Sequence, residues 1–166
     1  RLSLVGSEMC IRDRSLQSHR VASWLWNNDR HTLAHYFQSR TSEVYGVDIH
    51  PAAKLGKGIM IDHGTGVVIG ETSIVEDNVS IFQGVTLGGT GKEIGNRHPK
   101  VREGVLLSAS STILGNVEIG RNAKIAAGSV VLEDVKEGST VAGVPAKEVG
   151  KSDGLIPADE IDHSIK

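Results

Sequence analysis

The sequence predicts a mainly β protein in which a parallel β-helix of six-residue repeats follows a short α-helical segment. The first observation is periodicity, because aliphatic residues recur every six positions from Ile49 onward. The second is composition: 20 of 166 residues are glycine and only 4% are aromatic, so stacked aliphatic side chains with glycine corners must build the core. The third is a spacing of apolar residues near 3.6 before that point, which is typical of amphipathic helices.

Residues 1–14 share neither pattern. They resemble translated sequencing-adaptor sequence, and the chain does not begin with Met. We therefore expect this segment to be non-native or disordered, and the native N-terminus to be truncated. Cys10 is the single cysteine, which excludes an internal disulfide.

Residues 15–44 are predicted to form two helices. Asn and Asp favour caps and turns, so the Asn-Asn-Asp at 27–29 is interpreted as the break between them. Trp24 and Trp26 are interpreted as packing anchors. Two helices bury little surface alone, so we expect them to dock on another structure, such as a second subunit.

The β-helix domain is predicted to extend over residues 47–150, with the six-residue repeat ending at Val131. Three hexads form one triangular coil of about 18 residues, with the aliphatic residue inward and Gly or Asn at the corners. The aliphatic positions fall in three series, with a two-residue slip after the first: Ile49, Leu55, Ile61 and Val67; Val75, Ile81 and Leu87; Val101, Leu107, Ile113, Ile119, Ile125 and Val131. A charged, glycine-rich segment at 88–100 interrupts the repeat and is expected to protrude as a loop on the binding face. Residues 151–166 are expected to be a flexible polar tail.

Charge and hydropathy exclude several classes of function. The formal net charge of −2 favours neither nucleic acid nor an anionic membrane as a partner. No apolar run approaches the roughly 18 residues that a membrane span needs. Leu2–Val5 is too short for the apolar core of a signal peptide. The sequence thus predicts a cytoplasmic protein.

Four motifs resemble those of the serine O-acetyltransferases: VDIHPAAKLGKGIMIDHGTGVVIGET, VTLGGTGK, GNRHPKVREGV and AGVPAKEVG. These hexapeptide-repeat enzymes transfer acetyl from acetyl-CoA to L-serine, giving O-acetylserine for cysteine biosynthesis. The resemblance implies a left-handed β-helix, acetyl-CoA as co-substrate, no metal, and a homotrimer with a site in each groove between subunits.

The resemblance implies that His63 is the general base and that Asp48 orients it. Histidine suits this role at neutral pH because its unperturbed pKa is about 6.5, and a carboxylate on the second ring nitrogen fixes the tautomer. Asp48 and His63 are 15 residues apart, a little under one coil of about 18, so we expect them on neighbouring coils at the same corner. Ile61 takes the inward position, so Asp62 and His63 should point outward.

The resemblance assigns the remaining roles. Asp62 and Arg97 hold the amino and carboxylate groups of serine, and His98 completes the pocket as a substrate-binding and catalytic residue. The predicted coenzyme A contacts are Gly88, Gly89, Thr90, Ala109 and Lys124.

The sequence also departs from the family pattern. Ser108 and Ser110 stand where the family usually carries glycine, which narrows the predicted coenzyme A groove. The family has a longer helical N-terminal domain that joins two trimers into a hexamer, and residues 15–46 are interpreted as its remnant. The family's C-terminal Ile binds O-acetylserine sulfhydrylase, whereas this chain ends in Lys166.

Three alternatives remain open from the residues. The enzyme could acetylate another hydroxyl acceptor such as a sugar, or the chain could be a truncated, non-catalytic trimeric scaffold. A zinc site could use His50, His63 and His98, although zinc sites usually contain more closely spaced His pairs. His50, which precedes Pro51, is interpreted more simply as the cap of a turn.

Overall fold

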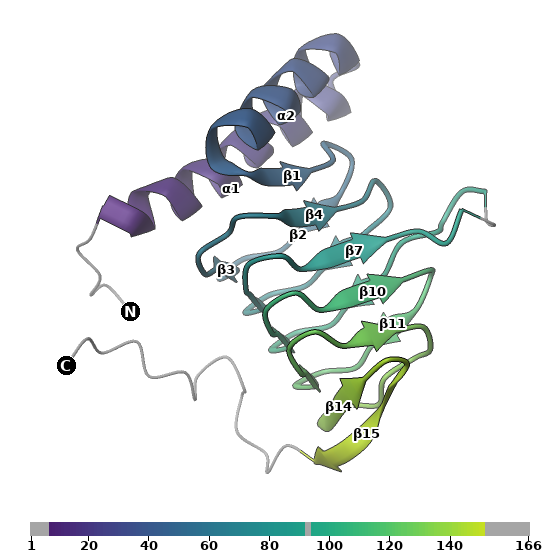
Figure 1. Ribbon diagram of the computed structural model, residues 1–166. Coiled ribbons are helices and arrows are strands. Elements are labelled where there is room, and N and C mark those ends of the chain that lie inside the picture. The colour runs from purple at the N-terminus through teal and green to yellow at the C-terminus, as the bar shows by residue number, and fades with distance from the viewer. Residues whose placement is uncertain (1–6, 92–93, 152–166) are drawn as a thin grey trace.

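The computed structural model describes residues 7–91 and 94–151, and side chains from residue 14 onward. Two helices, α1 (Ser7–Asn27) and α2 (His31–Tyr45), precede a stack of short strands (Figure 1). The predicted helix break at 27–29 is confirmed. However, α1 begins at Ser7, so residues 7–14 of the segment expected to be disordered are helical. Whether residues 1–14 are native stays a prediction, and the tail from residue 152 lies outside the described residues.

The strands form three sheets that make the faces of a prism. Sheet A has the order β1-β4-β7-β10-β13, sheet B the order β11-β8-β5-β2, and sheet C the order β15-β14-β12-β9-β6-β3. All pairings are parallel except that of β14 with β15. The bounds are β1 Val47–Ile49, β2 Lys54–Leu55, β3 Met60–Ile61, β4 Val67–Ile69, β5 Ile74–Val75, β6 Ser80–Ile81, β7 Thr86–Gly88, β8 Lys100–Val101, β9 Leu106–Leu107, β10 Thr112–Leu114, β11 Glu118–Ile119, β12 Lys124–Ile125, β13 Val130–Val131, β14 Ser139–Gly143 and β15 Ala146–Lys151.

The predicted β-helix is confirmed, and its core is the inward aliphatic column of each face. In sheet C, Ile61 pairs with Ile81 and Ile81 with Leu107, and all three are at most 1% exposed. Burying one such side chain contributes about 1.5–3 kcal/mol, so a continuous stack replaces the aromatic core that the composition lacks.

One detail of the predicted repeat is wrong. In sheet A, Ile49 pairs with Ile69, and Val67 pairs with Val47. The two-residue slip therefore lies at the corner before Val67 rather than after it. Val67 and Ile69 are both buried, because alternate residues of a strand face the same side. Spacing alone could not choose between them.

The helices dock on the first coil of the prism. Leu16 and Leu25 of α1 are buried, and Arg20 donates a hydrogen bond from Nη2 to the Gly56 carbonyl at 3.0 Å. Trp26 packs against neighbouring imidazoles, as an anchor should. Trp24 does not act as a packing anchor within this chain, where it is 61% exposed. It lies two positions before Trp26, and on a helix this spacing points the two side chains to different faces. Neither helix is long and apolar enough to cross a membrane, over the residues that the structure describes.

Candidate active site

The predicted site residues lie mainly at the two ends of the sheet A strands. We call the junction of sheets C and A the His63 corner, and it consists of residues 62–66, 82–84 and 108–110. We call the junction of sheets A and B the Arg97 corner, and it consists of residues 50–53, 70–73 and 89–99 apart from 92–93. The five residue-to-residue steps from Thr65 to Gly70 separate the two corners by roughly 16 Å, at about 3.3 Å per step.

At the His63 corner, the imidazole points outward as expected. The His63 side chain is 62% exposed, whereas Ile61 is buried in the prism. The backbone of His63 has a φ of 58°, a left-handed conformation that non-glycine residues seldom adopt. Asp62 accepts a hydrogen bond from the His63 backbone N–H at 3.0 Å, and its other oxygen lies 3.9 Å from His63 Nε2. A carboxylate and an exposed imidazole thus occupy one rigid turn.

Asp48 does not lie at that corner. It is the central residue of β1, opposite Val68, and its Oδ1 accepts a hydrogen bond from Gln38 Nε2 at 2.7 Å. Over the described part of the chain, no hydrogen bond or ion pair joins Asp48 to His63. The expectation of a shared corner is therefore wrong within one chain. The two additional residues at the 62–66 corner lengthen this coil, so 15 residues fall short of a full circuit.

At the Arg97 corner, an ion pair holds the guanidinium. Arg97 Nη2 donates to Glu71 Oε2 at 2.6 Å, and both side chains are about one-third exposed. The hydrogen bond from Arg97 holds the pKa of Glu71 below its ordinary value. Sequence reasoning missed Glu71, although it lies within the quoted VVIGET motif. The ion pair with Glu71 thereby fixes the orientation of the Arg97 guanidinium.

His98 is buried beside Arg97 and is held by Thr72. The Thr72 hydroxyl oxygen accepts the backbone N–H groups of Arg97 and His98 at 3.0 and 3.1 Å, and it lies 2.9 Å from His98 Nδ1. The Thr72 backbone N–H also donates to that nitrogen at 3.2 Å. A backbone N–H can only donate, so Nδ1 accepts and the ring proton sits on Nε2. Burial, followed by the charge of Arg97, lowers the pKa of His98. With Nδ1 occupied by Thr72, the His98 ring presents an N–H group at Nε2.

His50 also has a structural partner. Its Nδ1 accepts a hydrogen bond from the Ala52 N–H at 3.1 Å, which confirms the interpretation as a turn cap. His50 and His98 belong to the Arg97 corner, whereas His63 belongs to the other. Within the described ranges, no group of three His, Cys, Asp or Glu side chains could hold a metal ion. The absence of a metal from the working protein stays a prediction.

Comparisons with known proteins establish the relationship. A family profile described as bacterial transferase hexapeptide (six repeats) matches residues 98–133. Serine acetyltransferase of Escherichia coli (strain K12) is 57% identical over 148 residues, which are 89% of this chain and 54% of that protein. The chain belongs to the serine acetyltransferase family.

Two solved structures of serine acetyltransferases share the fold. One, from Brucella abortus strain S19 in complex with coenzyme A, is 57% identical with a TM-score of 0.83, over 83% of this chain and 55% of that chain. Another, in complex with cysteine, is 56% identical with a TM-score of 0.86, over 91% of this chain and 59% of that chain. This chain thus spans about half the length of the serine acetyltransferases that it matches.

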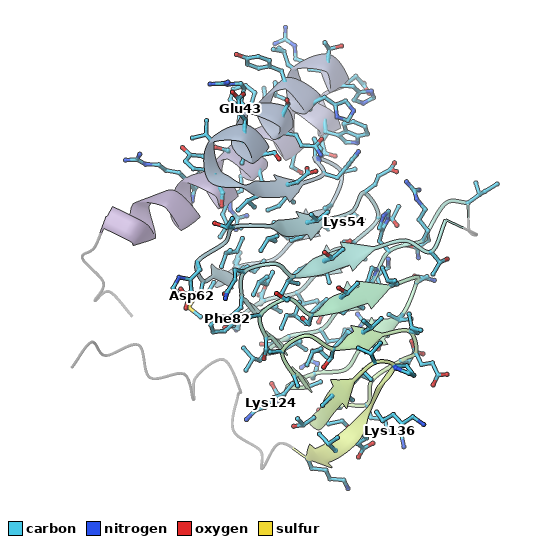
Figure 2. The ribbon with its side chains drawn as sticks, in the orientation of Figure 1. Glu43, Lys54, Asp62, Phe82, Lys124 and Lys136 are labelled. Atoms are coloured by element: carbon cyan, nitrogen blue, oxygen red, sulfur yellow. The ribbon has the colours of Figure 1, made fainter. Side chains whose placement is uncertain are left out.

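The residues expected to contact coenzyme A in a serine acetyltransferase are also split between the Arg97 corner and the His63 corner, as are the residues expected to bind serine. Gly88 ends β7 and leads with Gly89 and Thr90 into the Arg97 corner. Ala109 lies at the His63 corner, and Lys124 lies on β12 of sheet C beside it. Figure 2 shows the labelled Asp62, Phe82 and Lys124 along one edge of the prism. One chain does not bring the two sets together.

Serine at position 110 has a measurable structural consequence. Ser110 has a φ of 58°, stacked beside Gly84 with a φ of 70°. A Cβ added at Gly84 would lie 2.9 Å from Ser110 Oγ, so the hydroxyl already fills the space along this edge. The Ser110 side chain therefore leaves less open space beside Gly84 than a glycine at this position would.

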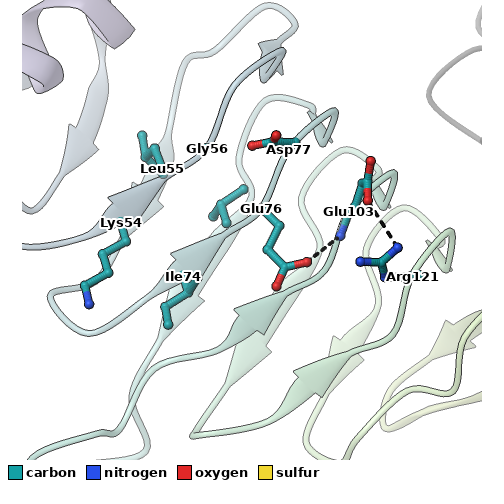
Figure 3. Close-up of a pocket in the computed structure, with 9 residues that line it drawn as sticks. Lys54, Leu55, Gly56, Ile74, Glu76, Asp77, Glu103 and Arg121 are labelled. Carbon is teal, nitrogen blue, oxygen red and sulfur yellow. Dashed lines mark hydrogen bonds and ion pairs between the residues drawn. The ribbon is translucent and has the colours of Figure 1, made fainter.

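A separate hollow lies on sheet B, away from these residues (Figure 3). Its cavity volume is about 460 Å³, and paired charges form its wall. Glu76 accepts the Glu103 backbone N–H at 3.1 Å, and Arg121 lies 3.2 Å from the Glu103 carboxylate. None of the predicted site residues lines this hollow, so it is not the expected acyl-transfer site.

Proposed function

We propose that the protein transfers the acetyl group of acetyl-CoA to the hydroxyl of L-serine and releases O-acetylserine, in the pathway of cysteine biosynthesis. The observation that carries the proposal is identity of 56–57% to serine acetyltransferases solved with coenzyme A and with cysteine. Cysteine has the same amino and carboxylate groups as serine. The residues proposed to hold those groups, Asp62 and Arg97, are both present here.

We propose that a complete site forms between neighbouring chains of a homotrimer. The support is the division of the predicted residues between two corners roughly 16 Å apart. The His63 corner of one chain would face the Arg97 corner of the next, so each of three grooves contains one complete set. With the longer helical domain of its relatives, two such trimers would form a hexamer.

In this site His63 acts as the general base. It takes the proton of the serine hydroxyl as that oxygen attacks the thioester carbonyl, and a tetrahedral intermediate forms. The intermediate collapses, the carbon–sulfur bond breaks, and the coenzyme A sulfur takes the proton back from His63. Proton transfer of this kind contributes about 10²–10⁴-fold to the rate. Asp48 stabilises the imidazolium and orients it, and this contact is made in the assembled protein.

The other residues bind and orient the substrates. Asp62 pairs with the serine ammonium, and Arg97 provides a planar pair of donors for its carboxylate. His98 donates from Nε2 beside Arg97. Gly88, Gly89 and Thr90 of one chain, with Ala109 and Lys124 of its neighbour, line the pantetheine arm of acetyl-CoA. The protein would work in the cytoplasm, and the tail beyond residue 151 is the proposed contact with O-acetylserine sulfhydrylase.

The test is release of thiol from acetyl-CoA in the presence and absence of L-serine. We expect release to require L-serine and to fall at least about 100-fold in His63→Ala. His31→Ala is the matched control, because it removes a half-exposed imidazole outside the site. Equal rates of thiol release in His63→Ala and the unchanged protein would refute the role of His63 as the general base.

Two further outcomes would reassign the function. Thiol release that depends on a sugar and not on serine would indicate a different hydroxyl acceptor. Calorimetry without a binding signal for coenzyme A would indicate a non-catalytic scaffold.

A further inference from the structure

We propose that Gln38 on α2 is a positioning residue that sets the orientation of the Asp48 carboxylate. This inference rests on the proposed role of Asp48 as the partner of His63. It assigns part of the catalytic geometry to the helical segment rather than to the β-helix.

The first support is a direct contact. Gln38 Nε2 donates to Asp48 Oδ1 at 2.7 Å, and both side chains are half-buried. A carboxylate can only accept, so the amide must present its NH₂ group to Asp48 and its oxygen to the other side. The assignment of the amide therefore follows from its partner.

The second support is that the amide oxygen is itself held. Gln38 Oε1 lies 3.1 Å from Nδ1 of His35, one turn earlier on α2. Because this oxygen can only accept, His35 must donate through an Nδ1–H group. The result is a directed chain of hydrogen bonds from His35 to Gln38 and from Gln38 to Asp48.

The third support is the packing around His35. Its ring meets Trp26 edge-on at 5.3 Å and His50 edge-on at 5.5 Å, and Trp26 also lies 5.1 Å from His50. These ring contacts join α1 and α2 to the turn that follows β1. The start of the hydrogen-bonded chain is therefore held by both helices and by the prism.

The remaining geometry leaves one carboxylate oxygen for function. Among the described residues, no other hydrogen bond reaches the Asp48 carboxylate. With Oδ1 held by Gln38, the carboxylate plane is set and Oδ2 remains for the imidazole of the proposed base. Without Gln38, the side chain rotates freely in its half-buried position, and fewer molecules present the oxygen correctly.

The test compares Gln38→Met, which keeps the length and packing of the side chain, with Gln17→Met, an exposed glutamine of α1. We expect Gln38→Met to lower kcat about tenfold, because a hydrogen bond to a charged group is lost. The KM values for serine and acetyl-CoA should remain within about twofold, because no substrate-binding group changes. Gln17→Met should match the unchanged protein in both quantities.

A double variant separates positioning from general stability. We expect Asp48→Ala to lower kcat, and Gln38→Met to lower it no further in the Asp48→Ala background. An additional loss in that background would overturn the proposal, because Gln38 would then act through something other than Asp48. An unchanged kcat in Gln38→Met, with a reduced kcat in Asp48→Ala, would overturn the role of Gln38 but not the proposed pairing of Asp48 with His63. An unchanged kcat in Asp48→Ala would overturn both.

A readout that needs no activity is the crystal structure of Gln38→Met. We expect the Asp48 side chain to leave the position that it has beside Gln38. If it keeps that position, the proposal is overturned whether or not the chain acetylates serine.

Discussion

The hydroxyl of Thr72 lies 2.9 Å from Nδ1 of His98 and accepts the backbone N–H of the same residue at 3.1 Å. These two contacts hold the buried imidazole in position, and the Thr72 backbone N–H, which donates to the same nitrogen at 3.2 Å, sets its tautomer. Thr72 follows β4 and His98 precedes β8, so residues 26 positions apart meet because a coil of the prism lies between them. The loop at 88–100 is thereby attached to the rigid scaffold at its C-terminal end, next to Arg97.

The first prediction concerns the space beside His98. A Cβ at Gly70 would lie 2.1 Å from His98 Cδ2, so Gly70→Ala must displace the ring. We expect the free energy of unfolding to fall by about 1–3 kcal/mol, as in other overpacked sites, and serine-dependent thiol release to fall with it. Urea unfolding and the activity assay measure the two effects. Gly150→Ala is the control, since a Cβ there meets no atom of the described residues within 4 Å. If Gly70→Ala and Gly150→Ala change the free energy of unfolding equally, His98 does not pack closely against Gly70.

The second prediction concerns backbone strain at Ser110, whose φ is 58°. A left-handed conformation costs a non-glycine residue about 1–2 kcal/mol, so Ser110→Gly should raise the free energy of unfolding by about 1 kcal/mol. Ser108→Gly is the matched control, because Ser108 is not among the residues with a positive φ. There, the added freedom of the unfolded chain should lower stability by about 0.5–1 kcal/mol. If both variants change the free energy of unfolding in the same direction, the backbone of Ser110 is not strained as we expect.

The third prediction concerns a buried hydroxyl. Among the residues that the structure describes, none hydrogen-bonds the buried Ser111 Oγ, whereas Ser129 Oγ accepts the Gly143 backbone N–H at 3.2 Å. A buried polar group without a partner costs about 1–3 kcal/mol. Ser111→Ala should therefore raise the urea midpoint, and Ser129→Ala should lower it, at one fixed protein concentration. A lower midpoint in Ser111→Ala would show that its hydroxyl does have a partner.

The fourth prediction concerns pH and the docking of α1. Burial, followed by the charge of Arg20, lowers the pKa of His19 from 6.5 to about 4, and no described residue hydrogen-bonds its Nδ1. Between these values the unfolded chain binds a proton that the folded chain does not. The contribution of neutral His19 to the free energy of unfolding is therefore fully present above pH 6.5, and it is lost as the pH drops toward 4. The loss is on the order of 3 kcal/mol at 1.36 kcal/mol per pKa unit.

Unfolding by urea at a series of pH values between 7 and 4 measures this dependence. His19→Leu removes the titrating group, so its stability should change less over the same range. His31→Leu is the control, because that imidazole is half-exposed. Equal pH dependence in His19→Leu and the unchanged protein would rule out His19 as the source.

Much of the fold follows from local sequence. Six-residue spacing of aliphatic residues predicts the β-helix, because each inward position must repeat once per side of a triangular coil. The break between α1 and α2 follows from turn-forming residues, and the outward placement of His63 follows from the buried position of Ile61. These features depend on neighbours within a few residues.

Contacts between residues on neighbouring coils could be identified only from the tertiary structure. Val67 and Ile69 both fit the inward pattern, and only strand pairing shows that Ile69 stacks on Ile49. Likewise, spacing placed Asp48 beside His63, whereas the structure places it beside Gln38. Glu71 and Thr72 showed no periodic signal, because their partners Arg97 and His98 reach them only through the stacking of successive coils.

The physical reason is the difference between period and register. A repeating pattern states which residues face inward, since hydrophobic burial acts on each side chain separately. It does not state how many residues each corner contains, and one or two extra residues change which polar side chains meet on the outside. The sequence alone therefore predicts the prism. The polar contacts on its surface depend on how the coils stack, which only the tertiary structure shows.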